Sequence, residues 1–506
     1  MCSTTHSNTR LMFRETDEAD NPTVTYIYSE QKAQKSASSG GRIDLLSTTS
    51  ESSLWSTRPL ITYLSDVFLP SGYPQSVSDD YLPYQIFDSL QAFCSSIAGL
   101  LSSRAVLQGV GVGNADASPT SALLLHILQD TSGRIATILF AHRVGTALEP
   151  ECKTYRLAAD VFNDLAMILD CLSPMVPAGV MRVSILSAAG VLRALCGVAG
   201  GSSKASLSAH FAKWGNLAEL NAKDSSQETV ISLIGMLVGS VVVSHVTGFT
   251  TTWIALLSLL ALHLSLNYAA VRSVQMTSLN RQRANIVLSA LFHSDTDIDL
   301  RHSTIPYEPD SDALTGLTVL TPAQVSAQER ISHRGGALQW TSPSNGSTKY
   351  LGSAEIGISL DTFFKHARRY NASTAPSANT STSFKTTLPM EHLTSIFENE
   401  PYILFLFPLP GNSTATWHAS ILLKKGCTVT GQLKAWAHAL LTARILSGPA
   451  HSSEEPLYVS GVVADVLDIL NEKGRFEGFL GALEKAGWDV GVGALETRGG
   501  RRVSLE

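Results

Sequence analysis

The distribution of hydrophobic and polar residues along the chain separates it into three parts. Residues 1–53 are rich in Ser, Thr and charged side chains and contain few large apolar residues. A segment of this composition cannot bury enough apolar surface to offset the entropy lost on ordering. We therefore predict that residues 1–53 form a disordered tail.

The second part, residues 55–292, consists of long, weakly charged segments with helical spacing of apolar residues. Ala, Leu, Gly, Ser and Val dominate these segments, and short Gly/Pro/Ser clusters separate them. The pattern predicts an all-helical domain. The expected helices are 79–107, 118–144, 151–173, 177–199, 203–221, 226–246, 250–275 and 278–293.

The third part begins after the acidic, unpatterned run HSDTDIDLRHSTIPYEPDSD, which predicts a linker over 293–318. Residues 319–506 then mix both periodicities. Strands are expected at 349–360, 400–407 and 416–426, and helices at 320–331, 428–447 and 460–485. The predicted fold class is mainly α: a hydrophobic multi-helix N-terminal domain followed by a small α+β C-terminal domain.

One segment of the helical domain has the pattern of a membrane hairpin. Thr229–Val271 contains no Asp, Glu, Lys or Arg across 43 residues, and Thr247-Gly248 marks a turn near its middle. Each half has about the 20 residues that one bilayer crossing needs. Both ends would face the cytoplasm, because basic residues flank them: Lys223, Arg272, Arg281 and Arg283. The alternative is a buried hairpin at the centre of a large soluble bundle.

The first residues of the chain and two glycines of the hairpin add to this prediction. The first 22 residues hold no apolar run of signal-peptide length, so we expect an intracellular membrane protein that is not secreted. The hairpin contains GMLVG, in which Gly235 and Gly239 have the spacing that allows two helices to approach closely. These glycines are candidate helix-packing positions, within the chain or between chains.

Composition excludes some classes of function. Charged residues make up only 16% of the chain and its net charge is −6, which argues against a nucleic-acid partner. The six cysteines form no C-x-x-C pair and have no histidine spacing typical of zinc, so we expect no metal. The glycine-rich QGVGVGN (108–114) lacks the third glycine of a dinucleotide-binding loop. We expect no catalytic residues and no cofactor.

Two polar helix faces are candidates for ligand binding. On the first, helical spacing places Arg156, Asp160, Asn163 and Asp164 together, either as a structural Arg156–Asp160 pair or as a ligand contact. The second precedes the hairpin and is either a polar helix cap or the lining of a binding path. The residues of this second face are His210, Asn216, Lys223, Gln227 and Glu228. Two further candidates, Asp88 and Gln91, come from the segment at residues 68–96.

Several blocks of the helical domain, taken in order, resemble the root UVB sensitive (RUS) family. They are FLPSGYPQSVSDDYLPYQIFDSLQAFCSS, LQGVGVGNADAS, LQDTSGRIATILFA, YRLAADVFNDLAMILDCLSPMVP and HFAKWGNLAELNAKDSSQETVISLIGMLVG. The resemblance covers about residues 55–290. It implies a membrane-associated or organellar protein without an assigned reaction, in a family whose plant members are linked to seedling development, light sensing and vitamin B6 homeostasis.

We therefore expect a non-enzymatic, membrane-associated protein that binds or moves a small polar metabolite. The alternative is a scaffold that forms homo- or hetero-oligomers, with another RUS-family protein for example, through its Gly- and Ser-rich helices and binds no small ligand. Substituting the polar faces would impair the first function, whereas substituting Gly235 and Gly239 would impair the second.

Overall fold

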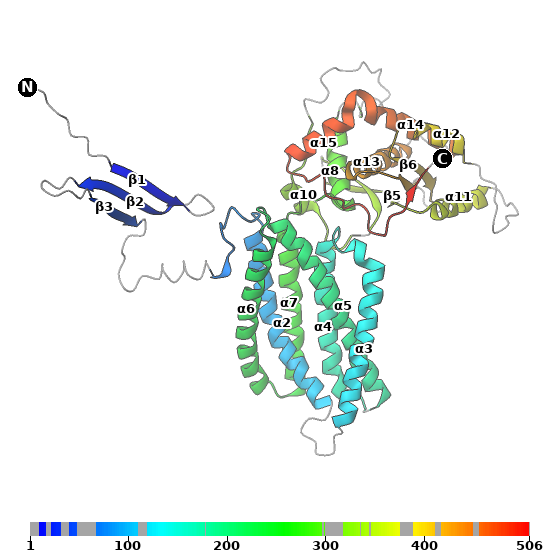
Figure 1. Cartoon of the computed structure of the whole chain (residues 1–506). Coiled ribbons are helices and arrows are strands. Elements are labelled where there is room, and N and C mark those ends of the chain that lie inside the picture. Colours follow the sequence, from blue (N-terminus) through cyan, green and yellow to red (C-terminus); the bar gives the residue numbers. More distant parts are fainter. Residues whose placement is uncertain are drawn as a thin grey trace, which may run out of the picture.

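The computed structural model describes two main bodies and a small sheet (Figure 1). A bundle of long helices leads into a domain that contains both helices and a sheet, so the predicted fold class is confirmed. The described residues are 10–16, 22–31, 40–47, 67–109, 119–177, 179–295, 298, 317–333, 335–343, 346–374, 388–409, 416–448 and 455–504.

The bundle consists of long helices that run alongside one another (Figure 1). Helix α2 packs against α4, α6 and α7, while α5 packs against α3 and α4. Helix α4 therefore lies inside the bundle, in contact with α2, α5 and α7. The helices are α2 (Tyr81–Gly109), α3 (Pro119–Val144), α4 (Cys152–Leu172), α5 (Val180–Phe211), α6 (Leu217–His245) and α7 (Phe249–Ser273).

One helix boundary differs from the prediction. The helices expected at 177–199 and 203–221 are in fact the single helix α5 and the first turn of α6. The Gly-Gly-Ser-Ser run at 200–203 lies inside α5, because isolated glycines are tolerated in a packed helix. The true break lies at 212–216, where Gly215 has a φ of 71°, a backbone conformation that favours glycine.

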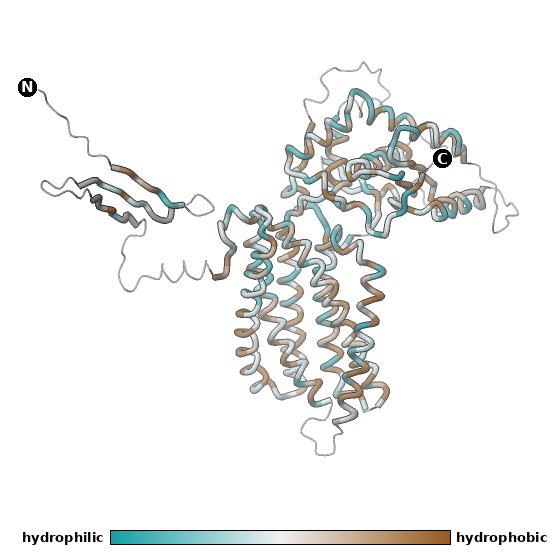
Figure 2. Tube along the Cα trace, viewed as in Figure 1, coloured by the Kyte–Doolittle hydropathy of each residue, from teal (hydrophilic) through white to brown (hydrophobic). Residues whose placement is uncertain are grey.

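Many large apolar residues lie exposed on the bundle, whose helices are drawn in brown and white over much of their length in Figure 2. Four of the described helices, α2, α5, α6 and α7, are long and apolar enough to cross a membrane. Soluble monomers rarely expose contiguous apolar surface on this scale. Among the exposed residues on α3 and α6 are Leu124, Leu128, Ile135, Ile138, Leu139, Leu233, Ile234, Leu237 and Val241.

The C-terminal domain is built on a mixed sheet with the strand order β4-β5-β7-β6, in which β8 also pairs with β7. The β5–β7 and β7–β8 pairs are parallel, whereas β4–β5 and β6–β7 are antiparallel. Three of the strands match predicted ones, and β4 and β8 were not predicted. The strands are β4 (Ala337–Thr341), β5 (Thr348–Ile356), β6 (Tyr402–Pro408), β7 (Trp417–Lys424) and β8 (Arg502–Val503).

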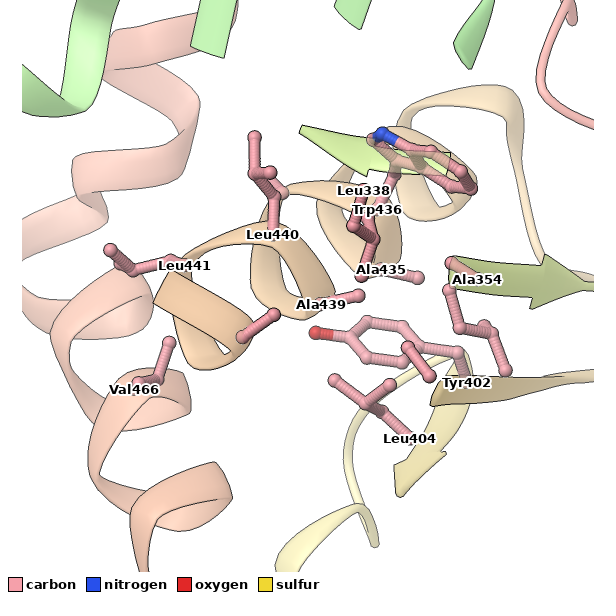
Figure 3. Close-up of a cluster of buried hydrophobic side chains, with 14 of the residues drawn as sticks. Leu338, Ala354, Tyr402, Leu404, Ala435, Trp436, Ala439, Leu440, Leu441 and Val466 are labelled. Carbon is pink, nitrogen blue, oxygen red and sulfur yellow. The ribbon is translucent and has the colours of Figure 1, made fainter. Parts of the chain in front are cut away.

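Helices cover both faces of this sheet. Tyr402 and Leu404 of β6 point towards α13, as Figure 3 shows, whereas Phe407 of β6 contacts Phe363 of α11 on the opposite face. The predicted helix 460–485 is divided at Lys473 and Gly474, both of which have positive φ. The helices are α10 (Pro322–Gln328), α11 (Leu360–Thr374), α12 (Met390–Ile396), α13 (Val429–Leu446), α14 (Pro456–Asn471) and α15 (Arg475–Lys485).

Helix α8 (Arg281–Ser294) falls within the range predicted for the helical domain, yet it packs into the C-terminal domain. Residues 282–292 are all buried, and most of the apolar ones belong to the core of the C-terminal domain. Within that core, Asn285 accepts a hydrogen bond from Trp436 Nε1 (2.9 Å) and donates one to the Ala337 carbonyl (2.7 Å). A helix buried on every side carries no amphipathic signal, so its pattern did not reveal its neighbours.

The tail predicted to be disordered contains strands. β1 (Arg10–Thr16), β2 (Pro22–Gln31) and β3 (Gly40–Ser47) form an antiparallel sheet. Its strands lie among Ser-, Thr- and charge-rich residues, so their alternation at Val24, Tyr26 and Tyr28 was not recognised. Most of the predicted linker and of the QGVGVGN stretch lies outside the described residues.

Candidate functional site

The interior of the bundle holds a line of charged side chains on one helix. Arg156, Asp160, Asp164 and Asp170 all lie on the buried face of α4. Fourteen residues of helix rise by roughly 21 Å, which is most of the thickness of about 30 Å that a bilayer's hydrocarbon core has. We call these four residues and their partners Asp88, Arg193, His263 and Asn267 the polar column.

The first pair of the polar column joins α4 to α2. Arg156 Nη2 lies 2.5 Å from Asp88 Oδ1, and both side chains are buried. Gln91 Nε2 donates to the same carboxylate oxygen at 3.2 Å. The predicted structural pair of Arg156 with Asp160 is therefore not formed, since Arg156 reaches across to the neighbouring helix instead.

The middle of the polar column joins α4 to α7. Asn267 Nδ2 donates to Asp160 Oδ2, and His263 Nε2 lies 3.7 Å from the same oxygen. His263 Nδ1 is 2.8 Å from Asp164 Oδ1. Among the described residues, His263 brings the one donor that approaches the Asp164 carboxylate, although Asp164 is only 3% exposed.

The far end of the polar column joins α4 to α2 and α5. Asp170 accepts a hydrogen bond from Ser102 Oγ (2.8 Å) and forms an ion pair with Arg193. The Asp170 carboxylate is 1% exposed, whereas Arg193 is 45% exposed. This last pair therefore opens towards the surface of the bundle.

The charges of the polar column do not balance. Four carboxylates face two guanidinium groups and one imidazole. Burying a charge without a partner is costly, so an excess of buried carboxylates favours a bound proton or another positively charged group. Ionisable residues inside membrane helices commonly mark a path for substrate or ions.

A second polar group lies at the end of the bundle where α2 begins. His210 Nε2 is 2.9 Å from Asp80 Oδ2, which also accepts a hydrogen bond from the backbone N–H of Gln275 at 2.5 Å. Burial alone would raise the pKa of Asp80, but the hydrogen bond and charge of His210 hold that pKa below its usual value. The Asp80 carboxylate thus ties α2 to α5 and to the segment after α7.

A third group is formed between α5 and α6. Lys204 Nζ lies 2.7 Å from Asp224 and 2.8 Å from Glu228, and Gln85 of α2 donates to Asp224 at 2.7 Å. Asp224 and Glu228 therefore share a face, as their spacing of four residues predicts. The ion pairs of these two carboxylates with Lys204 join α6 to α5. None of the three residues belongs to the polar column.

Besides Gln91, His210 and Glu228, four further predicted site residues lie outside the polar column. Lys223 Nζ donates to the Val67 carbonyl at 3.2 Å, and Gln227 Nε2 donates to the Phe68 carbonyl at 2.6 Å, so both hold the segment before α2. Asn163 donates to Ser95 of α2 at 3.3 Å. Asn216 lies in the turn between α5 and α6, at the N-cap of α6.

The two helix-packing glycines lie inside the bundle. A Cβ atom on Gly235 would sit 2.7 Å from Ser96 Cβ and 3.1 Å from the Phe93 carbonyl oxygen of α2. A Cβ atom on Gly239 would sit 2.8 Å from Leu100 Cδ1, also on α2. The G-x-x-x-G surface is thus occupied by α2 of the same chain.

The C-terminal domain is joined to the bundle beside the polar column. Lys153, one turn before Arg156, lies 2.5 Å from Glu329 Oε2, and Arg283 of α8 lies 3.7 Å from the other oxygen of this carboxylate. Burial alone would raise the pKa of Glu329, but the charges of Arg283 and Lys153 hold it below its usual range. Arg272 at the end of α7 also donates to the Ser326 carbonyl at 3.0 Å.

Sequence reasoning missed four of the eight residues of the polar column. His263 and Asn267 stand four residues apart on an otherwise apolar helix, so they share a face, and this spacing was an available signal. Arg193 was noted only as an interruption of hydropathy, and Asp170 was not considered. Their roles became visible only when the structure brought α2, α4, α5 and α7 together.

The comparisons with known proteins agree with the resemblance seen in the sequence. Residues 55–295 match the family model described as "Vitamin B6 photo-protection and homoeostasis domain". The chain is 43% identical over 239 residues to RUS family member 1 of Dictyostelium discoideum, covering 46% of this chain and 45% of that protein. It is 37% identical over 223 residues to protein root UVB sensitive 3 of Arabidopsis thaliana, covering 44% and 50%.

The matched region is confined to part of each relative. Protein root UVB sensitive 2, chloroplastic, of Arabidopsis thaliana is 27% identical over 244 residues, which cover 48% of this chain and 53% of that protein. The alignments thus span about half the length of these relatives. No solved structure matches the chain. Through residues 55–295 the chain belongs to the root UVB sensitive family, which is linked to vitamin B6 photo-protection and homoeostasis.

Proposed function

We propose that the helical bundle lies in an intracellular membrane and binds or moves a small polar metabolite along the polar column, without catalysing a reaction. The observation that carries the proposal is the line of buried charges on α4, enclosed by helices with apolar outer faces. Intramembrane charges are costly and are retained where they line a functional path. The family's link to vitamin B6 makes a B6 vitamer the first metabolite to test.

The excess of carboxylates favours a ligand that carries a positive charge or is taken up together with a proton. Asp164 is the best placed group for such a contact, because the imidazole of His263 is its one close partner among the described residues and its second carboxylate oxygen is left over. Asp160 lies one helical turn away and is held by Asn267. A protonated amine or pyridinium group would complete the charge of this pair.

The test uses the full chain reconstituted in lipid vesicles with radiolabelled pyridoxine as the probe. We expect saturable binding or uptake that Asp164→Asn lowers by about tenfold or more, since a lost charged contact contributes about 1.5 to 3 kcal/mol. The matched control is Asp79→Asn, which makes the same chemical change on a side chain that is 97% exposed. Equal activity of both variants, or no binding of any B6 vitamer by the wild type, would remove the support for this function.

The scaffold alternative is not favoured by a specific contact. The G-x-x-x-G surface that would join two chains is filled by α2. An oligomer would therefore need a different surface, such as the apolar faces of α3 and α6. Those faces are equally suited to lipid.

A further inference from the structure

Three side chains of the C-terminal domain converge on one face of its sheet. Glu355 comes from β5, His418 from β7 and His366 from α11, and one donor atom of each lies within 4.8 Å of the others. All three side chains are half-buried. This group stands apart from the polar column and belongs to a different domain.

The strand register explains why the three residues meet. β5 and β7 are parallel, with Ser353 opposite His418 and Glu355 opposite Ser420. Alternate residues of a strand point to the same face, so these four side chains form a patch on one face of the sheet. Helix α11 covers that face, since His366 contacts both Phe407 of β6 and the ring of His418, whose centroid is 4.5 Å away.

We propose that Glu355, His366 and His418 form a binding site for a divalent transition metal of the zinc class. Two imidazoles and one carboxylate are a frequent ligand set for zinc and leave a fourth position open. Tetrahedral ligands at about 2.1 Å from zinc stand about 3.4 Å apart. Small side-chain rotations therefore bring the three donor atoms from their present spacing into coordination.

Hydrogen bonds already orient both imidazoles for this role. His418 Nδ1 lies 2.8 Å from Ser353 Oγ, and His366 Nδ1 lies 2.9 Å from Ser420 Oγ. When Nδ1–H donates to a hydroxyl, Nε2 carries the lone pair that a metal needs. Partners of this kind fix the tautomer and orientation of metal-binding histidines.

The surrounding charges select the kind of ion. Glu355 and His418 line a cleft of about 480 Å³ that also holds Arg281 and Arg498, and Arg498 Nη1 lies 3.3 Å from Glu355 Oε1. Magnesium and calcium need several carboxylate or carbonyl oxygens, which this cationic cleft does not offer. Zinc-class ions instead bind imidazole nitrogen strongly, and the guanidinium groups favour an anion or hydroxide at the open position.

The test is zinc binding by the full chain, purified in detergent without a polyhistidine tag, stripped with a chelator, supplied with zinc and then freed of unbound metal. We expect one zinc per chain by elemental analysis and a tetrahedral absorption spectrum after cobalt substitution. Ser353→Ala, which removes only an orienting hydroxyl, should weaken zinc binding by about 10- to 100-fold. His366→Ala should weaken it further, and Glu355→Gln should do so with the least change in shape.

The matched control is His392→Ala, which removes an exposed histidine of α12 and should leave zinc binding unchanged. Circular dichroism of each variant checks its folding, and Glu355→Gln carries the test if His366→Ala does not fold. The proposal is overturned if the wild-type chain retains no zinc. It is equally overturned if folded Glu355→Gln and Ser353→Ala bind zinc as the wild type does.

Discussion

The helical bundle and the C-terminal domain distribute apolar and charged side chains in opposite ways. In the bundle, large apolar residues such as Leu139 and Leu237 are more than 60% exposed, while Asp88, Asp164 and Asp170 are at most 3% exposed. In the described part of the C-terminal domain, the exposed large apolar residues are Tyr350, Leu360, Leu457 and Val492, and the core is a continuous apolar cluster. The proposed membrane location of the bundle requires this difference, with lipid around the bundle and water around the C-terminal domain.

The largest loss of stability is expected when one partner of a buried ion pair in the bundle is removed. Arg156→Leu leaves Asp88 buried without its cation, and breaking such a pair costs about 3 to 5 kcal/mol. Thermal or chemical unfolding of the full chain in detergent measures the loss. The double variant Asp88→Asn, Arg156→Leu should regain most of it, because no unpaired charge remains. Equal stability of the single and double variants would show that the pair is not coupled.

An arginine introduced on the outer surface should have a different effect on stability in lipid and in water. Leu237→Arg on α6 (62% exposed) should destabilise the inserted bundle by up to about 3 kcal/mol, the cost of an arginine near the bilayer centre. The matched variant Leu457→Arg on α14 (65% exposed) should change stability by less than about 0.5 kcal/mol. Both are measured by unfolding in lipid bicelles. If Leu237→Arg is as harmless as Leu457→Arg, the outer face of α6 does not contact lipid.

Overpacking the contact between α6 and α2 should lower the stability by a smaller amount. Gly235→Ala places a methyl group 2.7 Å from Ser96 Cβ, and overpacking of this kind costs about 1 to 3 kcal/mol. Gly197→Ala on α5 is the control, because nothing lies within 4 Å of its added Cβ and alanine favours the helix. Unfolding and light scattering are measured together. Loss of an oligomer without loss of stability would instead support the scaffold alternative.

The smallest effect on stability concerns a buried histidine in the core of the C-terminal domain. His438 is completely buried, Nε2 lies 2.9 Å from the Val463 carbonyl oxygen, and burial lowers its pKa to about 3. The unfolded histidine titrates near 6.5, so acidification from pH 6.5 towards 3 adds protons to the unfolded state and lowers stability. Between pH 7 and 5.5 this amounts to roughly 1 kcal/mol.

The histidine's share is isolated by the variant His438→Gln, followed by urea unfolding at both pH values. Other groups also titrate in this range, so the informative quantity is the difference between the two proteins. The variant should lose about 1 kcal/mol less than the wild type on acidification. An identical loss in both would mean that His438 is protonated in the folded domain.

The sequence predicted what depends on periodicity. The spacing of Arg156, Asp160 and Asp164 placed them on one face of α4. The uncharged stretch predicted the turn of the α6–α7 hairpin and the end of α7 within a few residues, whereas α6 begins well before it. These features follow from 3.6 residues per turn and from the length of a bilayer crossing. They require no knowledge of neighbouring helices.

What the sequence could not predict depends on which elements become neighbours. Asp88 and Arg156 are 68 residues apart, and only the order of helices in the bundle makes them a pair. The same holds for Glu355 and His418, which parallel strand pairing brings together. The neighbours of helix α8 could not be predicted for the same reason, because a helix buried on all sides is compatible with packing in either domain.

The most direct test of the two-solvent account is the collision rate of spin labels with oxygen and with a water-soluble nickel chelate, in lipid vesicles. Labels are placed at Leu237→Cys and Leu457→Cys after Cys2, Cys196 and Cys427 are changed to serine, while the buried Cys94, Cys152 and Cys171 are kept. We expect the label at position 237 to collide mainly with oxygen and the label at position 457 mainly with nickel. Equal access of nickel to both positions would contradict a lipid-facing bundle, and with it the proposed path through the membrane.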